Sequence, residues 1–301
     1  MTEKNKRLLI TAAVLAALAI LLCLTATLLA KKNNVALFKQ TQNEEGNFVY
    51  TYDFAEENIK KISLDISYTD VNIIGGAEKC RIELINFAEE NFRMTVSATT
   101  IAVEEKSGLA GLVSLNFGGL RNHLNSFRML TKAKTINIYL TDTSVMKLLE
   151  TDIYSGNINL ENCNLSCDYN IKVKYGSVAA ASLSSDGSFD VTIYDGNLDI
   201  SDSEFASHSA AITRGYENIV FSRFTTLKSE IETGYFKYET GNYSLLSSVL
   251  RLSTDTGRVR FGGDIYENGS FSQGMKYTGI SSVLQVLVEV HVSDGNIMIT
   301  E

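Results

Sequence analysis

The 301-residue sequence contains no proline and only three histidines and four cysteines. Average usage would supply about 15 prolines to a chain of this length. Because proline cannot donate a hydrogen bond to a β ladder, its absence is compatible with a chain that is mostly strand. His123, His208 and His291 lie far apart, without a second ligand at metal-binding spacing. We therefore expect surface or strand-face histidines and no zinc site.

The cysteines are too few for a disulfide scaffold. Cys23 lies in a hydrophobic run, which leaves Cys80, Cys163 and Cys167. A bridge between Cys163 and Cys167 is conceivable, but residues four apart in a regular strand are too far separated to bond without a bend. We expect buried, unpaired thiols.

One long uncharged segment stands near the start of the chain. Residues 8–30 carry no charge over 23 residues, and a helix of that length spans about 35 Å, more than the roughly 30 Å hydrocarbon core. A cleaved signal peptide has a shorter apolar region, of about 7 to 15 residues, and the run lacks an A-x-A site at its end. The sequence predicts an uncleaved transmembrane helix over 8–30, a cytoplasmic N-terminus over 1–7 and a polar stalk over 31–46.

The charges around this segment predict its orientation and bear on the partners. Lys4, Lys6, Arg7 and the amino terminus precede the helix, whereas Lys31 and Lys32 follow it, so the positive-inside rule places residues 47–301 outside the cytoplasm of a single-pass membrane protein. The first 32 residues hold five Lys or Arg and one Glu; without them, the totals of 27 and 35 become 22 basic and 34 acidic residues, a net charge of −12. Such a domain is expected to repel nucleic acid and, beyond its anchor, anionic lipid.

Alternation with a period of two begins after the stalk. Ile62, Leu64 and Ile66 recur at every second position, as do Val71 and Ile73, which is typical of strands with one buried face. The segments 81–87, 94–103 and 136–140 follow the same pattern. Residues 108–134 interrupt it with glycines and scattered leucines, and we interpret them as an insertion.

A repeat of roughly 20 residues governs the remainder of the chain. Its glycines are separated by 20, 20, 19, 19, 23 and 38 residues, the last being close to two units: Gly156, Gly176, Gly196, Gly215, Gly234, Gly257 and Gly295. Self-similarity at such a period is the signature of a solenoid.

Three apolar columns accompany these glycines. The first lies three residues before the glycine and is interrupted only by Thr254: Ile153, Val173, Ile193, Ile212, Ile231 and Val292. The second lies two residues after it: Ile158, Val178, Leu198, Phe236, Val259 and Ile297. The third lies four residues after it: Leu160, Ala180, Ile200, Ile219, Tyr238, Phe261 and Ile299. Glu217 breaks the second column, which we interpret as a one-residue shift of the kind that a β-bulge produces.

The unit describes two strands that meet at a corner, where glycine supplies a positive φ angle or a close backbone approach. Stacking such units at about 4.8 Å builds continuous ladders of buried side chains. The sequence therefore predicts an all-β protein, a parallel β-helix-like β-solenoid over 47–301. Ile66, Thr69, Val71 and Ile73 fit the same template with threonine at the corner, so we expect the solenoid to start before the insertion.

The segments ISLDISYTDVNII at 62–74 and INIYL at 136–140, together with the glycine units, resemble the putative-adhesin (toast-rack) family of bacterial β-solenoid domains of unknown function. The resemblance covers about residues 47–301. It implies an envelope domain, often behind an N-terminal membrane helix and associated with stress-linked genes, and it carries over no catalytic residue. The chain departs from the family at Thr141, where we would expect proline, and in the composition of 108–134.

Two motifs of ligand-binding proteins are incomplete. Asp195, Asn197 and Asp199 alternate as in a calcium loop, but Ile200 and Ala206 occupy the positions that require glycine and glutamate; alternating polar residues on an outer strand face are the preferred interpretation, with calcium as the alternative. Residues 269–274 run from glycine to glycine, but Met-Lys follows, which breaks the phosphate-loop signature.

Paired carboxylates on a lateral face would support a cell-surface glycan-active enzyme, since β-helices include polysaccharide-cleaving enzymes. The candidates occupy different offsets from their glycines: Asp152, Asp190, Asp195, Asp199, Asp255 and Asp294, with Arg258 or Arg260 as a partner. We expect solvated faces instead, and keep the enzyme as the alternative.

The sequence thus predicts a non-enzymatic, membrane-anchored module that is adhesin-like, scaffolding or envelope-stress-sensing, without catalytic, cofactor or metal residues. Its expected partners are the membrane, through the N-terminal helix, and an envelope protein or glycan. The last apolar column ends two residues before Glu301, so we also expect an unpaired C-terminal edge that favours self-association. A further interpretation gives the helix the functional role, with Cys23 and the small residues Ala16, Ala17 and Ala19 packing against another membrane protein.

Overall fold

The computed structural model describes residues 39–44, 46–87, 92–105, 133–241, 249–262, 264–267, 270–273 and 286–300. Every regular element in these ranges is a β-strand, which confirms the all-β prediction. Within the described ranges, no helix has the length and apolarity needed to cross a bilayer. The predicted N-terminus over 1–7, the transmembrane helix over 8–30 and nearly all of the 108–134 insertion lie outside these ranges.

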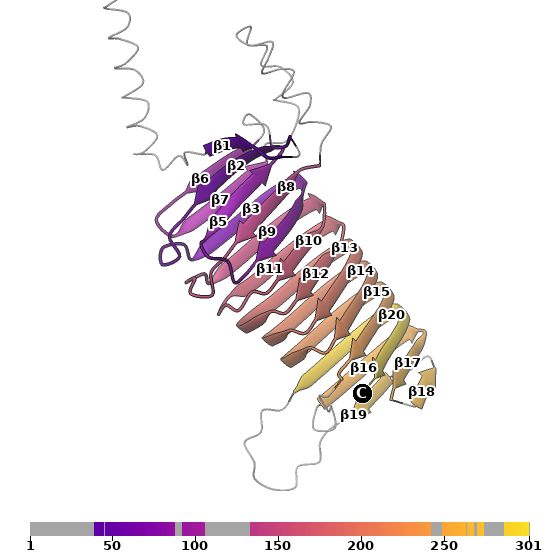
Figure 1. Ribbon diagram of the computed structural model, residues 1–301. Helices are drawn as coiled ribbons and strands as arrows, with labels where there is room; N and C mark the ends of the chain where they lie inside the picture. Colours follow the sequence, from indigo (N-terminus) through magenta and orange to yellow (C-terminus); the bar gives the residue numbers. More distant parts are fainter. Residues whose placement is uncertain are drawn as a thin grey trace, which may run out of the picture.

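The fold is a stack of two-stranded coils that forms an elongated body (Figure 1). In four coils the two strands run on as one long element: β13 (Ser184–Ser201), β14 (Glu204–Val220), β15 (Arg223–Glu239) and β20 (Leu287–Thr300). In the others the corner separates them: β3 (Lys61–Tyr68) and β4 (Asp70–Ile74), β9 (Leu148–Ser155) and β10 (Ile158–Glu161), β11 (Asp168–Tyr175) and β12 (Val178–Ala181), and β16 (Val249–Thr256) and β17 (Arg258–Phe261). Strands β7 (Thr100–Glu105) and β8 (Thr135–Tyr139) complete one further coil beside β3 and β4.

Neighbouring coils pair in parallel and in register, which confirms the predicted ladders. Ile153 pairs with Val173, Val173 with Ile193, Ile193 with Ile212, and Ile212 with Ile231. Each of these side chains is at most 2% exposed, so the ladder forms a continuous apolar core that no coil buries alone.

The corner glycines also behave as predicted. Their φ angles lie between 138° and 155°, a region that residues with a Cβ rarely adopt. A Cβ atom on Gly215 would lie 1.7 Å from the carbonyl oxygen of Gly196 in the preceding coil. Coils therefore approach each other at the corner too closely for any side chain. Gly156 lies against Thr69 in the same way, and Ile66 pairs with Ile153, which confirms that the solenoid starts before the insertion.

The order of coils along the stack differs from their order in the chain. Strand β20, the last in the sequence, lies between β15 on one side and β16 and β17 on the other (Figure 1). The prediction of an unpaired edge at the C-terminal strand is therefore wrong, because β20 is paired on both sides. The 38-residue spacing before Gly295 arises because the coil of β16 and β17 comes before β20 in the sequence but lies beyond β20 in the stack.

Antiparallel strands close both ends of the stack. At one end β18 (Asp264–Glu267) pairs with β17, and β19 (Ser270–Gln273) pairs with β16. At the other, β6 (Phe92–Val96) pairs with β7, and β5 (Arg81–Ile85) pairs with β8, followed by β2 (Phe48–Asp53) and β1 (Lys39–Gln42). Part of the segment predicted as a polar stalk thus forms β1. These caps cover edges that would otherwise be open to strand addition.

The cysteine prediction is confirmed in the described part of the chain. Cys80, Cys163 and Cys167 are buried and unpaired. Burial is the main cause that raises the pKa of Cys163 and of Cys167, each to about 12, so both thiols are held in their neutral form. They contribute to packing.

Candidate functional site

The six candidate aspartates do not gather in one place. Those with side-chain partners find them locally: Asp195 with Arg214 at 2.8 Å, Asp199 with Asn218 at 3.1 Å, Asp255 with His291 at 3.7 Å, and Asp294 with Thr256 at 2.8 Å. Asp190 accepts a hydrogen bond from the Ser188 hydroxyl at 3.0 Å, and Asp152 is in register with Asp65 and Lys172. Arg258 donates its backbone N–H to Asn296, and Arg260 is in register with Met298. The described residues contain no group of three His, Cys, Asp or Glu side chains that could hold a metal ion.

Acid–base groups do meet at one place in the core. His208 and Glu217 have fully buried side chains, and His208 Nε2 lies 2.6 Å from Glu217 Oε1. Ser229 donates its hydroxyl to the other carboxylate oxygen, and His208 Nδ1 lies 2.8 Å from the carbonyl oxygen of Phe189. Of the expected surface or strand-face histidines, His208 lies on the inward face of β14 and is not at the surface. His291 is partly exposed and hydrogen bonds to Ser253, whereas His123 lies outside the described residues.

The bulge predicted at Glu217 is also wrong. Glu217 pairs in register with Leu198 in one neighbouring coil and with Phe236 in the other. The register irregularity between β13 and β14 lies at Ser185–Ser188 instead. Glu217 points inward like its apolar neighbours because His208 and Ser229 satisfy its oxygens. Since the cluster is closed to solvent, it has a structural role and cannot reach a substrate.

The most regular exposed feature is a line of tyrosines along the glycine corner. Six consecutive coils, from β3 and β4 to β15, each place one tyrosine within two residues of the corner residue, and we call this set the tyrosine edge: Tyr68, Tyr154, Tyr175, Tyr194, Tyr216 and Tyr235. Tyr216 is partly buried, and the other five are between 36% and 64% exposed. Exposed aromatic side chains in such a series make this edge a candidate contact surface.

The rings of the tyrosine edge contact each other in two runs. Tyr68, Tyr154, Tyr175 and Tyr194 meet edge to face, with ring centroids 5.6, 5.4 and 5.9 Å apart along the series. Tyr216 and Tyr235 stack with centroids 4.9 Å apart and planes 11° from parallel. These arrangements suit the ring quadrupole, so the rings support each other.

Two cations lie over these rings. Lys174 Nζ is 4.7 Å from the ring centre of Tyr154 and 5.5 Å from that of Tyr175. The Arg214 guanidinium is 5.2 Å from the ring centre of Tyr194 and also pairs with Asp195. Such contacts contribute modestly at an exposed site, and they limit the positions that the rings can take.

A polar column runs beside the rings. Asp70, Asn157, Ser177 and Asn197 hold the position directly after the corner in successive coils, and the Asn157 amide and backbone N–H donate to Asp70. Ser177 in turn donates its backbone N–H to Asn157. The tyrosine edge therefore combines aromatic rings with amide, hydroxyl and carboxylate groups.

Burial raises the pKa of Tyr216, and the neighbouring Asp199 raises it further.

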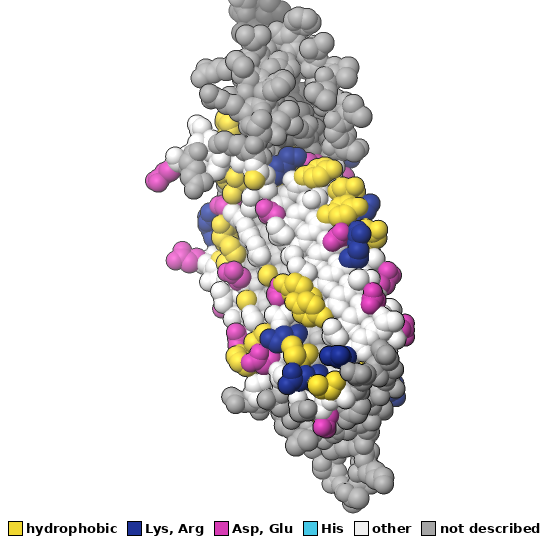
Figure 2. Space-filling view, turned by 90° about the vertical axis from the view of Figure 1, so that its right-hand side faces the viewer, with side chains coloured by type: hydrophobic (Ala, Val, Ile, Leu, Met, Phe, Trp, Pro, Cys, Tyr) yellow, Lys and Arg dark blue, Asp and Glu magenta, His cyan; other side chains and the backbone are white. Residues whose placement is uncertain are grey.

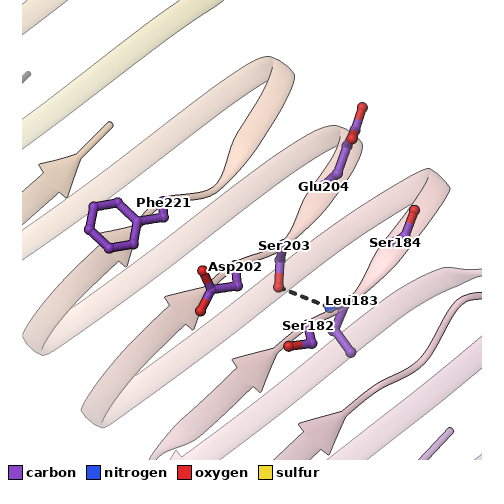
Figure 3. Close-up of a pocket in the computed structure, with 7 residues that line it drawn as sticks. All are labelled: Ser182, Leu183, Ser184, Asp202, Ser203, Glu204 and Phe221. Carbon is purple, nitrogen blue, oxygen red and sulfur yellow. Dashed lines mark hydrogen bonds between the residues drawn. The ribbon is translucent and has the colours of Figure 1, made fainter. Parts of the chain in front are cut away.

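The opposite corner carries a shallow groove of about 330 Å³. Figure 3 shows its lining, which comes from the turns of successive coils: Ser182, Leu183, Ser184, Asp202, Ser203, Glu204 and Phe221. Ser182, Asp202 and Phe221 take left-handed φ angles of 56°, 48° and 49°, and Phe221 is 46% exposed. The groove is polar and open, and it lacks a concentrated set of reactive groups.

The wider surface carries no dominant charge on the face shown in Figure 2. Uncharged polar side chains and backbone cover most of the described area, hydrophobic side chains form separate patches, and acidic and basic side chains are scattered among them. Neither an anion-binding surface nor a catalytic cleft stands out on this face.

The parallel coils, corner glycines and antiparallel caps define a β-solenoid domain. Residues 59–301 match the family model described as Toastrack DUF4097, so the chain belongs to this family, as the sequence resemblance predicted. No curated protein matches the sequence.

Three solved bacterial structures illustrate what the chain is similar to. A "putative cell adhesion protein" from Clostridium sporogenes is 14% identical, with a TM-score of 0.33, over 87% of this chain and 99% of that one. A "putative adhesin" from Bacteroides fragilis is 10% identical, with a TM-score of 0.37, over 86% and 99%. A "putative lipid binding protein" from Parabacteroides distasonis is 10% identical, with a TM-score of 0.33, over 84% and 97%.

Sequence reasoning missed the tyrosine edge, although a signal was present. The repeated phrases YSGNINL and YDGNLDI each begin with a tyrosine two residues before the glycine, and GYEN and GYFK each place one directly after it. The tyrosines change side of the glycine from coil to coil, so they form no single sequence column. The fold aligns them because both sides of the corner face the same edge.

Proposed function

We propose that the chain is a non-enzymatic, adhesin-like binding module of the cell envelope and that the tyrosine edge is its contact surface. The observation that carries this proposal is the series of one tyrosine in each of six consecutive coils, presented on a frame of in-register ladders. Rigid aromatic anchors lose little conformational entropy on binding, and they dominate the energetics of many interfaces.

The proposal includes anchoring by the predicted helix over 8–30, with the N-terminus in the cytoplasm and the solenoid outside. Its support is the 23-residue uncharged run and the flanking basic residues. Anchored in this way, the elongated stack would extend the tyrosine edge away from the membrane. Scaffolding or envelope-stress sensing would follow from occupancy of this edge by a partner.

Retention on immobilised envelope material tests the binding function. The full chain is purified in a detergent without a sugar headgroup and passed over the envelope fraction of the source cells. Wild type should be retained, and Tyr154→Ser with Tyr175→Ser should weaken retention by roughly tenfold, as expected for central aromatic anchors. Phe221→Ser is the matched control, because it removes an exposed aromatic ring at the opposite corner, where Ser182 already occupies the equivalent position.

Equal retention of the tyrosine variant and the control would show that the tyrosine edge is not the contact surface. Circular dichroism and the melting temperature of each variant establish that the fold is kept. Both substitutions replace exposed rings by small polar residues, so neither is expected to disturb the buried ladders.

Labelling of introduced cysteines tests the location. The described native thiols are buried, so a membrane-impermeant maleimide reports on the introduced site. Glu204→Cys, at the exposed first residue of β14, should react in cells stripped of any outer barrier, whereas Lys4→Cys should react only after lysis. The reverse pattern would contradict the proposed orientation.

A further inference from the structure

The geometry points to a specific occupant for the tyrosine edge: we propose that it binds a linear polysaccharide of uncharged or weakly charged sugars. This inference rests on the proposed binding function and goes further by naming the class of ligand. Its basis is the repeat of the edge, the chemistry of the groups along it and their charge balance.

The edge repeats along the stack axis. The coils step by about 4.8 Å, and each of six coils contributes one tyrosine next to its corner. A partner that uses all six rings must itself present similar groups at regular intervals along a line. A linear polysaccharide has this property because its sugar rings repeat along the chain, whereas the surface of a globular protein without internal repeats does not repeat in this way.

The chemistry of the edge suits sugar rings. A pyranose has faces rich in C–H groups and a rim of hydroxyls; aromatic faces carry negative charge density and attract polarised C–H groups. Exposed Tyr68 and Tyr235 provide such rings. In the four coils that carry Tyr68, Tyr154, Tyr175 and Tyr194, the polar column of Asp70, Asn157, Ser177 and Asn197 lies beside the rings and offers donors and acceptors for hydroxyls. Tyr216 and Tyr235 take the column's position in the next two coils.

The charges argue against a strongly ionic ligand. Lys174 and Arg214 lie over the rings, Asp195 is paired with Arg214, and Asp70 stands at the start of the polar column. Glu232, exposed two residues before Gly234, adds a third acid to the edge. Acidic groups thus slightly outnumber basic ones there, and the chain after residue 32 carries a net charge of −12. A polyanion would be repelled on approach.

Strand addition by a protein is disfavoured along this edge. The coils of the tyrosine edge are paired in parallel with neighbours on both sides, from β3 with β7 and β9 through to β15 with β14 and β20. Their backbone groups are used within the stack, so a peptide gains no ladder hydrogen bonds there. Side-chain contact remains, which fits a ligand held by rings and hydroxyls.

The test compares intact envelope with the polysaccharide fraction obtained from it by proteinase K and phenol extraction. The full chain in sugar-free detergent is titrated with this fraction before and after exhaustive acid hydrolysis, which cleaves the glycosidic bonds of neutral polysaccharides whatever their linkage. We expect binding before hydrolysis, loss of binding after it, and roughly tenfold weaker binding by Tyr154→Ser with Tyr175→Ser. Phe221→Ser should bind like wild type.

Three results overturn the inference in different ways. If intact envelope retains the chain but the deproteinised polysaccharide does not bind, or binds equally after acid hydrolysis, the occupant is not a polysaccharide and the binding function stands. If intact envelope fails to retain the chain, both the polysaccharide inference and the proposed binding function are wrong. Equal binding by the tyrosine variant and wild type also overturns it, because the ligand then sits elsewhere.

Discussion

Replacing Glu217 by leucine should destabilise the solenoid, although leucine matches the apolar residues above and below it. Glu217 lies between Leu198 and Phe236 in the ladder, and its side chain is fully buried. The substitution removes the partner of His208 Nε2 at 2.6 Å and of the Ser229 hydroxyl. Because the carbonyl of Phe189 only accepts, His208 Nδ1 is the donor in that bond, and Nε2 is left without a partner in the core.

The magnitude follows from the cost of breaking a buried polar pair. Removing one partner of such a pair typically costs about 3–5 kcal/mol, a large part of the roughly 5–15 kcal/mol that stabilises a domain. Removing all three polar groups together should avoid this cost. His208→Leu, Glu217→Leu and Ser229→Ala place apolar groups beside Leu227, Phe236 and Ala210, and we expect stability equal to wild type or higher by about 1–4 kcal/mol.

Urea unfolding monitored by far-ultraviolet circular dichroism measures both effects, since the chain has no tryptophan. The expected order of unfolding midpoints places the Glu217→Leu variant lowest, with the triple variant at or above wild type. A single variant within about 1 kcal/mol of wild type would show that the cluster contributes little. A triple variant less stable than the single one would refute the reasoning that the loss comes from unpaired polar groups.

Four further outcomes follow from the corner, the thiols and the strained turn. Gly215→Ala should strongly destabilise or prevent folding, because its Cβ would lie 1.7 Å from the carbonyl oxygen of Gly196; a loss in urea unfolding below about 1 kcal/mol would contradict the close approach. Cys163 and Cys167 should resist a thiol reagent at pH 8 and react after unfolding, since burial raises the pKa of each to about 12; rapid native labelling would argue against their burial. The pKa of these thiols is near 9.0 in the unfolded state and about 12 in the folded state, so between these pH values the unfolded state binds fewer protons. The free energy of unfolding should therefore fall as the pH rises from 9 to 12. A pH series of urea midpoints that stays flat would count against the raised pKa values. Phe221→Asn should raise stability by about 1 kcal/mol, because asparagine tolerates the left-handed φ of 49° better; a lower melting temperature would show that the ring's contacts outweigh the strain.

The ladders and corners were predictable because they depend on local spacing. An apolar residue three positions before a glycine and two more after it recur in almost every unit, and stacking converts each recurrence into a contact. The same reasoning identified the early coil at Ile66 and Val71, where threonine replaces glycine. These features need only the period of the sequence, which a single chain displays.

The buried cluster could not be predicted from the columns alone. Glu217 and His208 are nine residues apart on the two strands of one coil, and each is an exception in its own column. A glutamate in an apolar column is ordinarily explained by a shift of register, since an unpaired carboxylate in a core is costly. Only the folded coil brings the two inward faces together and shows that His208 and Glu217 are hydrogen-bond partners.

The position of β20 was also beyond the sequence pattern. Many ladder residues are similar aliphatic groups, so Val288 fits against Leu227 or against Leu250 equally well by type. Thr254, the break in its column, hydrogen bonds to the carbonyl oxygen of Gly295 at 3.1 Å, a contact that exists only because β20 lies beside β16. Periodicity determines the coil, and specific polar contacts of this kind help to determine the order of coils.

Cross-linking tests the order and register of the stack, on which the tyrosine edge and both caps depend. Thr233 is in register with Asp294, and Asp294 with Thr256, so Thr233 and Thr256 are separated by two coil steps, about 10 Å, beyond the reach of a disulfide. Oxidation of Thr233→Cys with Asp294→Cys should form an intramolecular disulfide, and Thr233→Cys with Thr256→Cys should form none. Cross-linking of the second pair without the first would contradict the account, because the coils would then stack in chain order.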